Sequence, residues 1–394
     1  GGKKLMTLFG GSYFFYITIM LAIPTIVLGY LGKTQKYYGF LVSILMVYLT
    51  MRETPTAIAY MAVYCLLELV IVKGYQMICT RGIKNNKLYY LFITLSLMPL
   101  VIWKITSFTG VGKGIFAFIG ISYMSFKSIQ MIIEIHDGLI KDISIFEFLY
   151  FLIFFPSLLS GPIERSRDFH RDLTELPGRD AYIEMLGDGL MKVCLGMIYK
   201  FVLAAGLYQS LIWLGRGDRI PNLIVYMYSY GGYLFFDFAG YSLMAVGVGY
   251  IFGVKLPDNF RKPFLATDMK DFWDRWHISL SYWFRDFLFS RITMALVRTR
   301  KIKNKLVIAS IAFMINMFVM GVWHGLELNY IVYGLYHGVL LSACEIFQKK
   351  SKFYKAHKKD KWFIGVSWFI TLHLVMFGFF IFSGRLGILL SNQG

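Results

Sequence analysis

Charged side chains are scarce in this chain. Asp, Glu, Lys and Arg make up only 16% of its 394 residues, whereas soluble domains carry about 25%. Apolar residues make up 57%, and the mean hydropathy is +0.57. This composition excludes an ordinary soluble domain and predicts a chain that crosses a membrane several times. Because the apolar runs are continuous rather than alternating, we predict an all-α, polytopic integral membrane protein rather than a barrel.

Cysteine is scarce too, and the common motifs of metal and serine chemistry are missing. The four cysteines lie scattered in or beside apolar stretches, which favours a role as core residues. A metal site is the weaker alternative because no HxxxH or HExxH spacing is present. Such a site would bring together three histidines, His277, His324 and His337, with either Asp237 or Asp274. No Gly-x-Ser-x-Gly elbow is found, which disfavours a nucleophilic Ser-His-Asp site. We expect no metal and no permanently bound cofactor.

Convincing repeats, low-complexity linkers and a cleavable signal peptide are also absent. We therefore expect one integral domain over residues 1–394. A straight span needs about 20 residues, and several apolar runs are shorter. We expect about eleven transmembrane helices plus short re-entrant or interfacial ones. The apolar runs lie approximately at 12–30, 37–51, 57–73, 88–103, 115–135, 144–160, 187–214, 222–253, 279–297, 306–322, 328–348 and 362–383.

Two segments interrupt this pattern of plain spans. The run 222–253 is long enough to be broken, and Gly231, Gly232, Gly240 and Gly247 supply places for a break. The loop 161–180 has a dense mixture of both charge signs. We expect short helices in that loop, lying along the membrane surface.

Positive charge is abundant, with a formal net charge of +18. It gathers in short loops between apolar runs, which indicates topology and contact with anionic lipid rather than nucleic-acid binding. The clearest cases are 298–305 (RTRKIKNK) and 349–361 (KKSKFYKAHKKDK). If both loops face the cytoplasm, the two apolar runs between them form a hairpin with His324 near its far turn. A helix of about 16 residues is shorter than the bilayer core, so His324 is expected within the membrane thickness.

The stretch 268–286 (DMKDFWDRWHISLSYWFRD) concentrates seven charges, three tryptophans and a histidine in an otherwise apolar chain. An ionised side chain at the bilayer centre costs about 3 kcal/mol or more, so such residues face a protein interior or a water-filled cavity. Read as one helix, the stretch places four apolar side chains on one face and three residues on a neighbouring stripe. The face holds Trp273, Trp276, Leu280 and Trp283, and the stripe holds Trp273, His277 and Ser281.

Three histidines are candidates for chemistry. His324 lies in MGVWHG, where the flanking glycines let a ligand or another backbone approach closely. A neutral imidazole there can accept a proton from a hydroxyl group, and the alternative is a buried histidine bonded to a carbonyl. His277 either orients a substrate or braces its helix. His337 is interpreted as structural.

Asp237 is an acid within a run of aromatic residues, FFDFAGYS. A carboxylate in such surroundings needs a partner or must be protonated. We expect it to pair with an arginine, such as Arg275 or Arg285, rather than to act as a catalytic acid.

Five motifs in this order and spacing resemble the membrane-bound O-acyltransferase family. They are SGPIERSRDF (160–169), FDFAGYS (236–242), LPDNFRKPF (256–264), DFWDRWHISLSYWFRDFLF (271–289) and MGVWHG (320–325). The resemblance implies a ring of helices around a central tunnel, with His324 as the principal catalytic histidine and His277 as the second. The residues expected to support the tunnel are Trp273, Trp276, Arg275, Asp237, Ser281 and Trp323.

Within this family the chain is most similar to the branch that transfers D-alanine in Gram-positive bacteria, since FSRI (289–292) departs from the alginate-type continuation. The resemblance implies a multi-pass protein of the bacterial plasma membrane. Its donor would be D-alanine held as a thioester on the phosphopantetheine of a small acidic carrier protein in the cytoplasm. Its acceptor would be lipoteichoic acid outside, with a small membrane peptide and an extracellular partner of the same pathway as further participants.

The segment 291–305 combines apolar and basic residues on the side expected to face the cytoplasm, which suits docking of an acidic carrier. The expected docking residues are Met294, Val297, Arg298, Arg300 and Lys301. The alternative for this segment is an ordinary positive-inside loop. Two alternatives to D-alanyl transfer stay open: an O-acetyltransferase of a surface polysaccharide, and a transporter or flippase.

Overall fold

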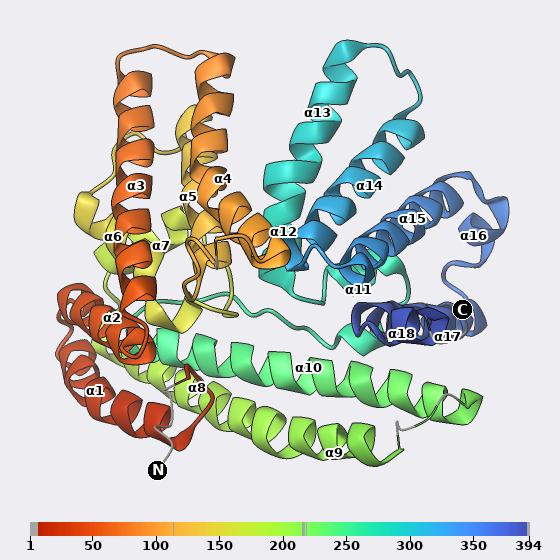
Figure 1. The fold of residues 1–394 in the computed structure, drawn as a ribbon, viewed down its shortest axis with the longest axis horizontal. Helices are drawn as coiled ribbons and strands as arrows, with labels where there is room; N and C mark the ends of the chain where they lie inside the picture. Colours follow the sequence, from red (N-terminus) through yellow and green to blue (C-terminus); the bar gives the residue numbers. More distant parts are fainter. Residues whose placement is uncertain (1–6, 113, 215–216, 218, 392–394) are drawn as a thin grey trace. The chain divides into compact units, whose positions relative to one another are not determined.

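The computed structural model describes residues 7–112, 114–214, 217 and 219–391, and these residues form helices joined by short loops (Figure 1). The α-helices are α1 (Ser12–Tyr30), α2 (Lys36–Met51), α3 (Pro55–Thr80), α4 (Asn86–Thr109), α5 (Ile121–His136), α6 (Ile145–Ile153), α7 (Ser166–Thr174), α8 (Arg179–Ile198), α9 (Ala205–Leu214), α10 (Ile220–Ile251), α11 (Met269–Trp273), α12 (Ile278–Phe284), α13 (Ser290–Thr299), α14 (Lys305–His324), α15 (Leu328–Lys350), α16 (Lys352–His357), α17 (Lys361–Phe382) and α18 (Arg385–Ser391). Short 3-10 or π-helical turns are η1 (Phe155–Ser157), η2 (Tyr199–Ala204), η3 (Pro263–Leu265) and η4 (Arg285–Phe289).

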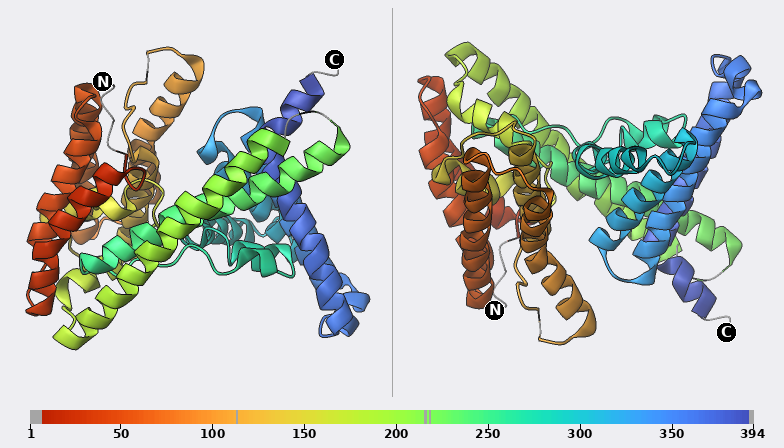
Figure 2. Two further views of the ribbon diagram at one scale, coloured as in Figure 1. Left: turned by 90° about the horizontal axis from the view of Figure 1, so that it is seen from below. Right: turned by 90° about the horizontal axis from the view of Figure 1, so that it is seen from above.

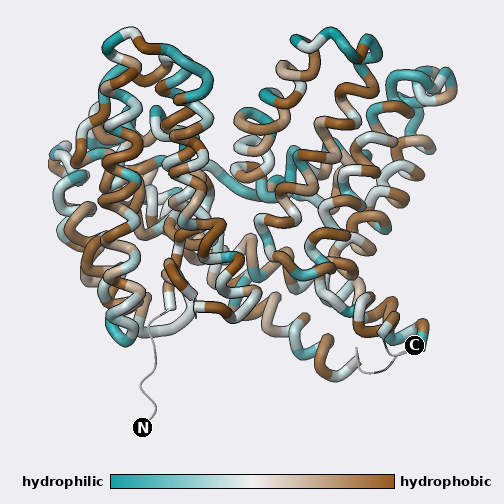
Figure 3. Tube along the Cα trace, turned by 45° about the horizontal axis from the view of Figure 1, so that its top comes forward, coloured by the Kyte–Doolittle hydropathy of each residue, from teal (hydrophilic) through white to brown (hydrophobic). Residues whose placement is uncertain are grey.

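Eight helical segments of the described chain are long and apolar enough to cross a membrane. They are α1, α3, α4, the joined helix α8–η2–α9, α10, α14, α15 and α17. About eleven were expected, and α2 is one of those that fall short, with 16 residues. Figure 3 shows hydrophobic colour along the long helices and hydrophilic colour mainly at the loops that join them. The prediction of an all-α, multi-pass membrane protein is confirmed.

The chain forms two compact units. Unit 1 comprises the described residues up to Met197 and the segment Tyr241–Pro257, and unit 2 comprises Ile198–Gly240 and the described residues from Asp258 onward. Helix α10 contributes its first part to unit 2 and its last part to unit 1. The prediction of one integral domain over residues 1–394 stays a prediction.

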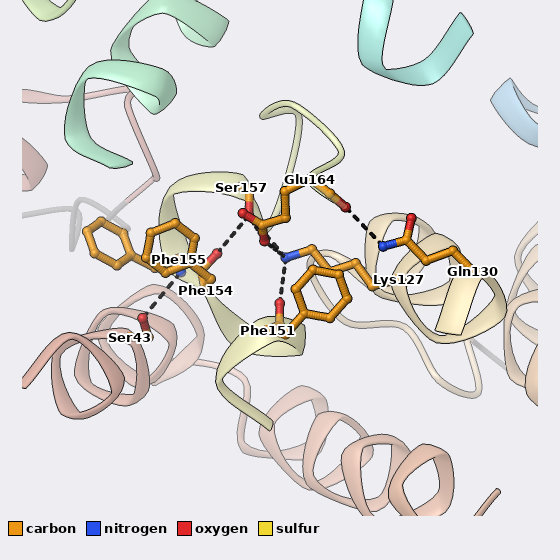
Figure 4. Close-up of polar contacts among 8 residues, drawn as sticks. All are labelled: Ser43, Lys127, Gln130, Phe151, Phe154, Phe155, Ser157 and Glu164. Atoms are coloured by element: carbon orange, nitrogen blue, oxygen red, sulfur yellow. Dashed lines mark hydrogen bonds and ion pairs between the residues drawn. The ribbon is translucent and has the colours of Figure 1, made fainter. Parts of the chain in front are cut away.

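Unit 1 is built around α5, whose side chains are buried along almost its whole length. A lysine within this helix, Lys127, is 1% exposed and donates three hydrogen bonds: to Phe151 O (2.6 Å), Ser157 Oγ (3.0 Å) and Glu164 Oε1 (2.6 Å) (Figure 4). Gln130 Nε2 donates to Glu164 O (3.0 Å) from the same helix. Because a buried charge is stable only when paired and hydrogen-bonded, this network ties α5 to α6 and to the segment before α7.

The loop 161–180 contains the short helix α7 and leads into α8, which begins at Arg179. That α7 lies along the membrane surface stays a prediction. The break expected within the long run 222–253 is not found, because α10 is continuous from Ile220 to Ile251. Its glycines serve close packing instead. In unit 1, a Cβ on Gly247 would collide with Gly189 O and lie 2.7 Å from Val193 Cγ2. A glycine at such a position lets two helices approach closely without bending either one.

In unit 2, α9 lies alongside the first part of α10 (Figures 1 and 2), and the rings of Tyr208 and Tyr233 are 5.4 Å apart between them. Helices α14 and α15 form the predicted hairpin, and His324 is the last residue of α14. A Cβ on Gly321 would lie 2.5 Å from Tyr330 O, and one on Gly334 would collide with Met317 O. These two glycines therefore hold the helices close together at the end where His324 lies.

Candidate active site

The segment around His277 is not the single helix that its sequence suggests. Helix α11 ends at Trp273 and α12 begins at Ile278, with His277 between them at φ 44° and ψ 53°. This left-handed conformation costs a non-glycine residue on the order of 1 kcal/mol and interrupts a right-handed helix. The four tryptophan and leucine side chains expected on one helical face are nevertheless all buried.

The preceding loop holds His277 in this conformation. Phe260 pairs with Trp276 in an isolated antiparallel bridge, and Arg261 N donates to Arg275 O (3.0 Å). On the other side of the histidine, Asn259 O accepts from Ile278 N (2.9 Å), and Asn259 Oδ1 accepts from Ser279 N and Oγ (3.2 and 2.6 Å). Because both neighbours of His277 are fixed by the backbone of 259–261, the strained residue between them is fixed too.

His277 and His324 line the same cavity, of about 50 Å³, within unit 2. We call it the histidine cavity. Apart from the two histidines its walls are apolar or aromatic, which makes it a dry site for proton transfer. The remaining lining residues are Leu234, Phe238, Trp273, Trp276, Leu280, Tyr333, Phe379 and Phe382.

His277 is 3% exposed, and the edge of its ring meets Phe238 with the centroids 4.6 Å apart. Burial, with His324 as a second and smaller influence, lowers the pKa of His277 well below its ordinary value. Its imidazole is therefore neutral at physiological pH. Within the described parts of the chain, neither His277 Nε2 nor the nearby Trp273 Nε1 has a hydrogen-bond partner. Such buried orphan atoms are rare, and they are available to a bound substrate.

A second cavity of about 280 Å³ is also lined by Trp273. We call it the Asp274 cavity, after the acid on its wall. Only the Trp273 side chain is common to the two cavities. The other lining residues of the Asp274 cavity are Lys270, Ser281, Tyr282, Phe284, Arg285, Phe289, Phe313, Asn316, Met317, Met320 and Leu341.

Of the residues predicted to support the tunnel, some line one of the two cavities and others line neither. Trp273 lines both cavities, Trp276 the histidine cavity, and Ser281 the Asp274 cavity. Arg275, Asp237 and Trp323 line neither cavity. Arg275 instead pairs with Asp271 (2.6 Å), one turn earlier.

The prediction that Asp237 pairs with an arginine is wrong. Its carboxylate pairs with Lys200 Nζ (2.5 Å) and not with Arg275 or Arg285. Lys200 lies in the π-helical turn η2. An extra residue in such a turn changes which side chains face a neighbouring helix, and the sequence pattern did not reveal that turn.

His337 is fully buried in α15 and lies edge-on to Trp273, with the ring centroids 5.2 Å apart. It lines neither cavity, and neither of its ring nitrogens has a hydrogen-bond partner among the described residues. Its interpretation as a structural residue stays a prediction. The residues that the structure describes contain no group of three or more His, Cys, Asp or Glu side chains suited to a metal ion. Unit 1 has its own cavity of about 230 Å³ beside the His170–Glu147 contact, and none of the predicted site residues lines it.

The predicted docking residues lie at the exposed end of α13 and in the loop after it. Met294 and Val297 are 45% and 54% exposed, and the basic side chains beside them are exposed as well. Those basic residues are Arg298, Arg300 and Lys301. These residues are exposed, and their role in docking a carrier stays a prediction.

Several wall residues of the histidine cavity were missed. Phe238 lies inside the FDFAGYS motif, so the motif itself marked it. Phe379 and Phe382 belong to α17, which is apolar on every side, and no periodicity distinguishes their face. Tyr333 lies four residues before His337 on α15, a spacing that places both on one helical face.

The helices describe a membrane-embedded protein. The two histidines on one dry cavity are suited to an enzyme that transfers protons or acyl groups. The sequence comparison specifies the class, because residues 27–384 match the membrane-bound O-acyltransferase (MBOAT) family. The chain belongs to this family, and it is an acyltransferase and a multi-pass bacterial membrane protein.

Within the family, the chain is similar to proteins of two kinds. The chain is 37% identical to the teichoic acid D-alanyltransferase of Bacillus subtilis over 391 residues, which cover 96% of this chain and 98% of that one. It is 38% identical to the teichoic acid D-alanyltransferase of Streptococcus thermophilus, with 95% of each covered. A more distant similarity, 32% over 270 residues, links it to the probable alginate O-acetylase of Pseudomonas fluorescens, covering 68% of this chain and 51% of that one.

Proposed function

We propose that this protein takes D-alanine from a thioester on a phosphopantetheinyl carrier protein and transfers it towards hydroxyl groups of lipoteichoic acid across the membrane. The geometric observation that carries the proposal is that His277 and His324 line one small, dry cavity. The choice of D-alanine rests on relatives named as teichoic acid D-alanyltransferases, which match this chain along nearly the whole length of both.

In the proposed reaction His324 is the general base. It accepts the proton of the acceptor hydroxyl while the oxygen attacks the thioester carbonyl carbon. The carbon–sulfur bond then breaks, and the imidazolium returns the proton to the leaving thiolate. An oxygen ester and a free pantetheine thiol result. No oxidant, reductant or metal is needed, because a thioester is already activated.

His277 supports the same step without changing its own charge. Its neutral ring has a buried nitrogen free of hydrogen bonds to the described chain. That nitrogen is available to hold the acceptor or to stabilise the oxyanion that develops on the thioester carbonyl. Trp273 Nε1, on the same wall, likewise has no hydrogen-bond partner among the described residues.

The direction of transfer follows from the basic loops. If 298–305 and 349–361 face the cytoplasm, the exposed end of α13 faces it too, and a DltC-like acidic carrier protein would dock there through Met294 and Val297. The pantetheine arm would then enter through the Asp274 cavity, whose α14 residues lie between that loop and His324. The acceptor, and the peptide and extracellular partner implied by the resemblance, would approach from the opposite side.

The test uses the protein in nanodiscs, with carrier protein charged with radiolabelled D-alanine and a lipid-linked teichoic acid acceptor. We expect label to leave the carrier and appear in the acceptor. Carrier charged with acetate, presented in parallel, is expected to be a poor donor. Efficient acetyl transfer with no D-alanyl transfer would contradict the proposal.

A polysaccharide O-acetyltransferase is the second candidate, since an alginate O-acetylase is among the relatives. The shared region covers only 68% of this chain and about half of that relative. The D-alanyltransferases share 95% or more of both lengths. D-alanyl transfer is therefore the better supported of the two.

A further inference from the structure

The Asp274 cavity contains charged side chains that are already committed to partners, and one that is not. Lys270 Nζ pairs with Glu345 and donates to Gln348 Oε1 (2.9 Å). Arg285 pairs with Asp286 (2.9 Å) and lies over the ring of Tyr282 (4.0 Å). No described residue forms a hydrogen bond or ion pair with the carboxylate of Asp274. Asp274 is exposed to the open side of the cavity, and Arg285 and Arg261 act on its charge only through space. The cavity wall therefore presents one negative charge without a directly bonded partner among the described residues.

A second acceptor in the same cavity is also free. Asn316 is 8% exposed on α14, and its Oδ1 has no partner among the described residues. Its Nδ2 reaches only the sulfur of Met317 (3.9 Å). A buried amide oxygen left unpaired costs about 1–3 kcal/mol, so a ligand that donates a hydrogen bond is the expected occupant of this wall.

From this arrangement we propose that the Asp274 cavity recognises the α-ammonium group of the aminoacyl donor, with Asp274 as its counter-ion and Asn316 as a second acceptor. This inference rests on the proposed function, because only an aminoacyl thioester carries that positive charge. Asp274 thereby selects D-alanyl over uncharged acyl donors of the same size. It is a specificity-determining residue and takes no part in bond breaking.

Two further observations agree with this assignment. Partial burial raises the pKa of the Asp274 carboxyl above its ordinary value, although Arg285 and Arg261 oppose the shift. A carboxylate with a raised pKa is stabilised when a cation binds beside it. Trp273, which lines both cavities, adjoins Asp274 in the sequence, so an ammonium held by Asp274 keeps its acyl carbon near the wall of the histidine cavity.

The donor size and the route also fit. The cavity measures about 280 Å³, against about 50 Å³ for the histidine cavity. The larger space is therefore suited to the alanyl group with the end of its pantetheine arm. An ammonium entering a membrane protein loses hydration, and a fixed carboxylate offsets that loss. An acetyl group would gain nothing from Asp274.

The experiment compares two donors that differ only in the amine: carrier protein charged with D-alanine and carrier charged with propionate. Single-turnover loss of the acyl group is measured for wild type, Asp274→Asn and Asp274→Glu in nanodiscs. We expect wild type to favour D-alanyl about ten- to a hundredfold, the equivalent of one charge-assisted hydrogen bond. Asp274→Asn should bring this ratio close to one without slowing propionyl transfer, and Asp274→Glu should restore part of it.

The rate of propionyl transfer reports whether each variant is folded. The matched control is Asp258→Asn, which alters an exposed charge outside both cavities. We expect this variant to keep the wild-type ratio of D-alanyl to propionyl transfer. Equal slowing of both donors by Asp274→Asn, or an unchanged ratio, would overturn the role of Asp274 alone. Failure of wild type to use either carrier-bound donor would instead overturn the proposed function on which it rests.

Discussion

Two buried polar clusters in this protein, one in each unit, differ in how completely they are satisfied. In unit 1, Lys127 Nζ has three acceptors within 3.0 Å. In unit 2, His277 Nε2 and Trp273 Nε1 have none among the described residues. A buried cation without partners would cost far more than a neutral ring atom. In the Lys127 cluster the cation is fully bonded, although Glu164 Oε2 and Gln130 Oε1 have no partner among the described residues. The comparison indicates that the Lys127 cluster holds the fold together, whereas the two ring nitrogens of the histidine cavity are available to substrate.

The largest effect that tests this contrast is expected from His324→Ala. Removing the proposed general base should lower D-alanyl transfer about a hundred- to ten-thousandfold, with little change in the unfolding temperature. Single-turnover transfer and thermal unfolding in detergent micelles would measure the two. The matched control is His373→Ala, a histidine of α17 that lines neither cavity. Full activity in a folded His324→Ala protein would remove His324 from the reaction.

Lys127→Met should lower the stability of the protein rather than act on the transfer reaction itself, because it breaks a buried pair and leaves Glu164 without its cation. Loss of one partner of such a pair lowers the free energy of unfolding by about 3–5 kcal/mol. Adding Glu164→Gln should recover part of this loss, since the remaining charge is removed too. Denaturant unfolding in micelles checks both variants, with the exposed Lys33→Met as control. A stable but inactive Lys127→Met protein would erase the distinction between the two clusters.

Much of this organisation is readable from the sequence, and the failures have specific causes. The hairpin of α14 and α15 follows from the basic loops at both its ends, and the Trp-His motifs mark both histidines of the cavity. The break at His277 is not readable, because a left-handed backbone at a non-glycine residue depends on the distant contacts of Asn259 and Arg261. The Lys200–Asp237 pair depends on a π-helical turn that leaves no periodic trace.

His277→Asn would sharpen the comparison within the site. Asparagine tolerates the left-handed backbone better than most residues, and Nε2 makes no hydrogen bond to the described residues that the substitution would break. The free energy of unfolding should therefore stay within about 1 kcal/mol of wild type. Transfer should fall about a hundredfold, as for loss of one oxyanion donor. Destabilisation as large as that of Lys127→Met would show that His277 is a bracing residue.

The smallest effect is expected at the surface, where Val297 on α13 is 54% exposed. Val297→Asp places a negative charge where an acidic carrier would dock, so the KM for D-alanyl carrier should rise about tenfold while kcat is unchanged. The matched control is Val111→Asp, which alters another exposed valine (70%) in the loop after α4. Steady-state transfer at low and high salt measures the difference, and high salt should reduce it because exposed charges are screened. Equal effects of the two substitutions would mean that α13 is an ordinary positive-inside segment. A selective effect would place the carrier on unit 2, the unit that holds the histidine cavity.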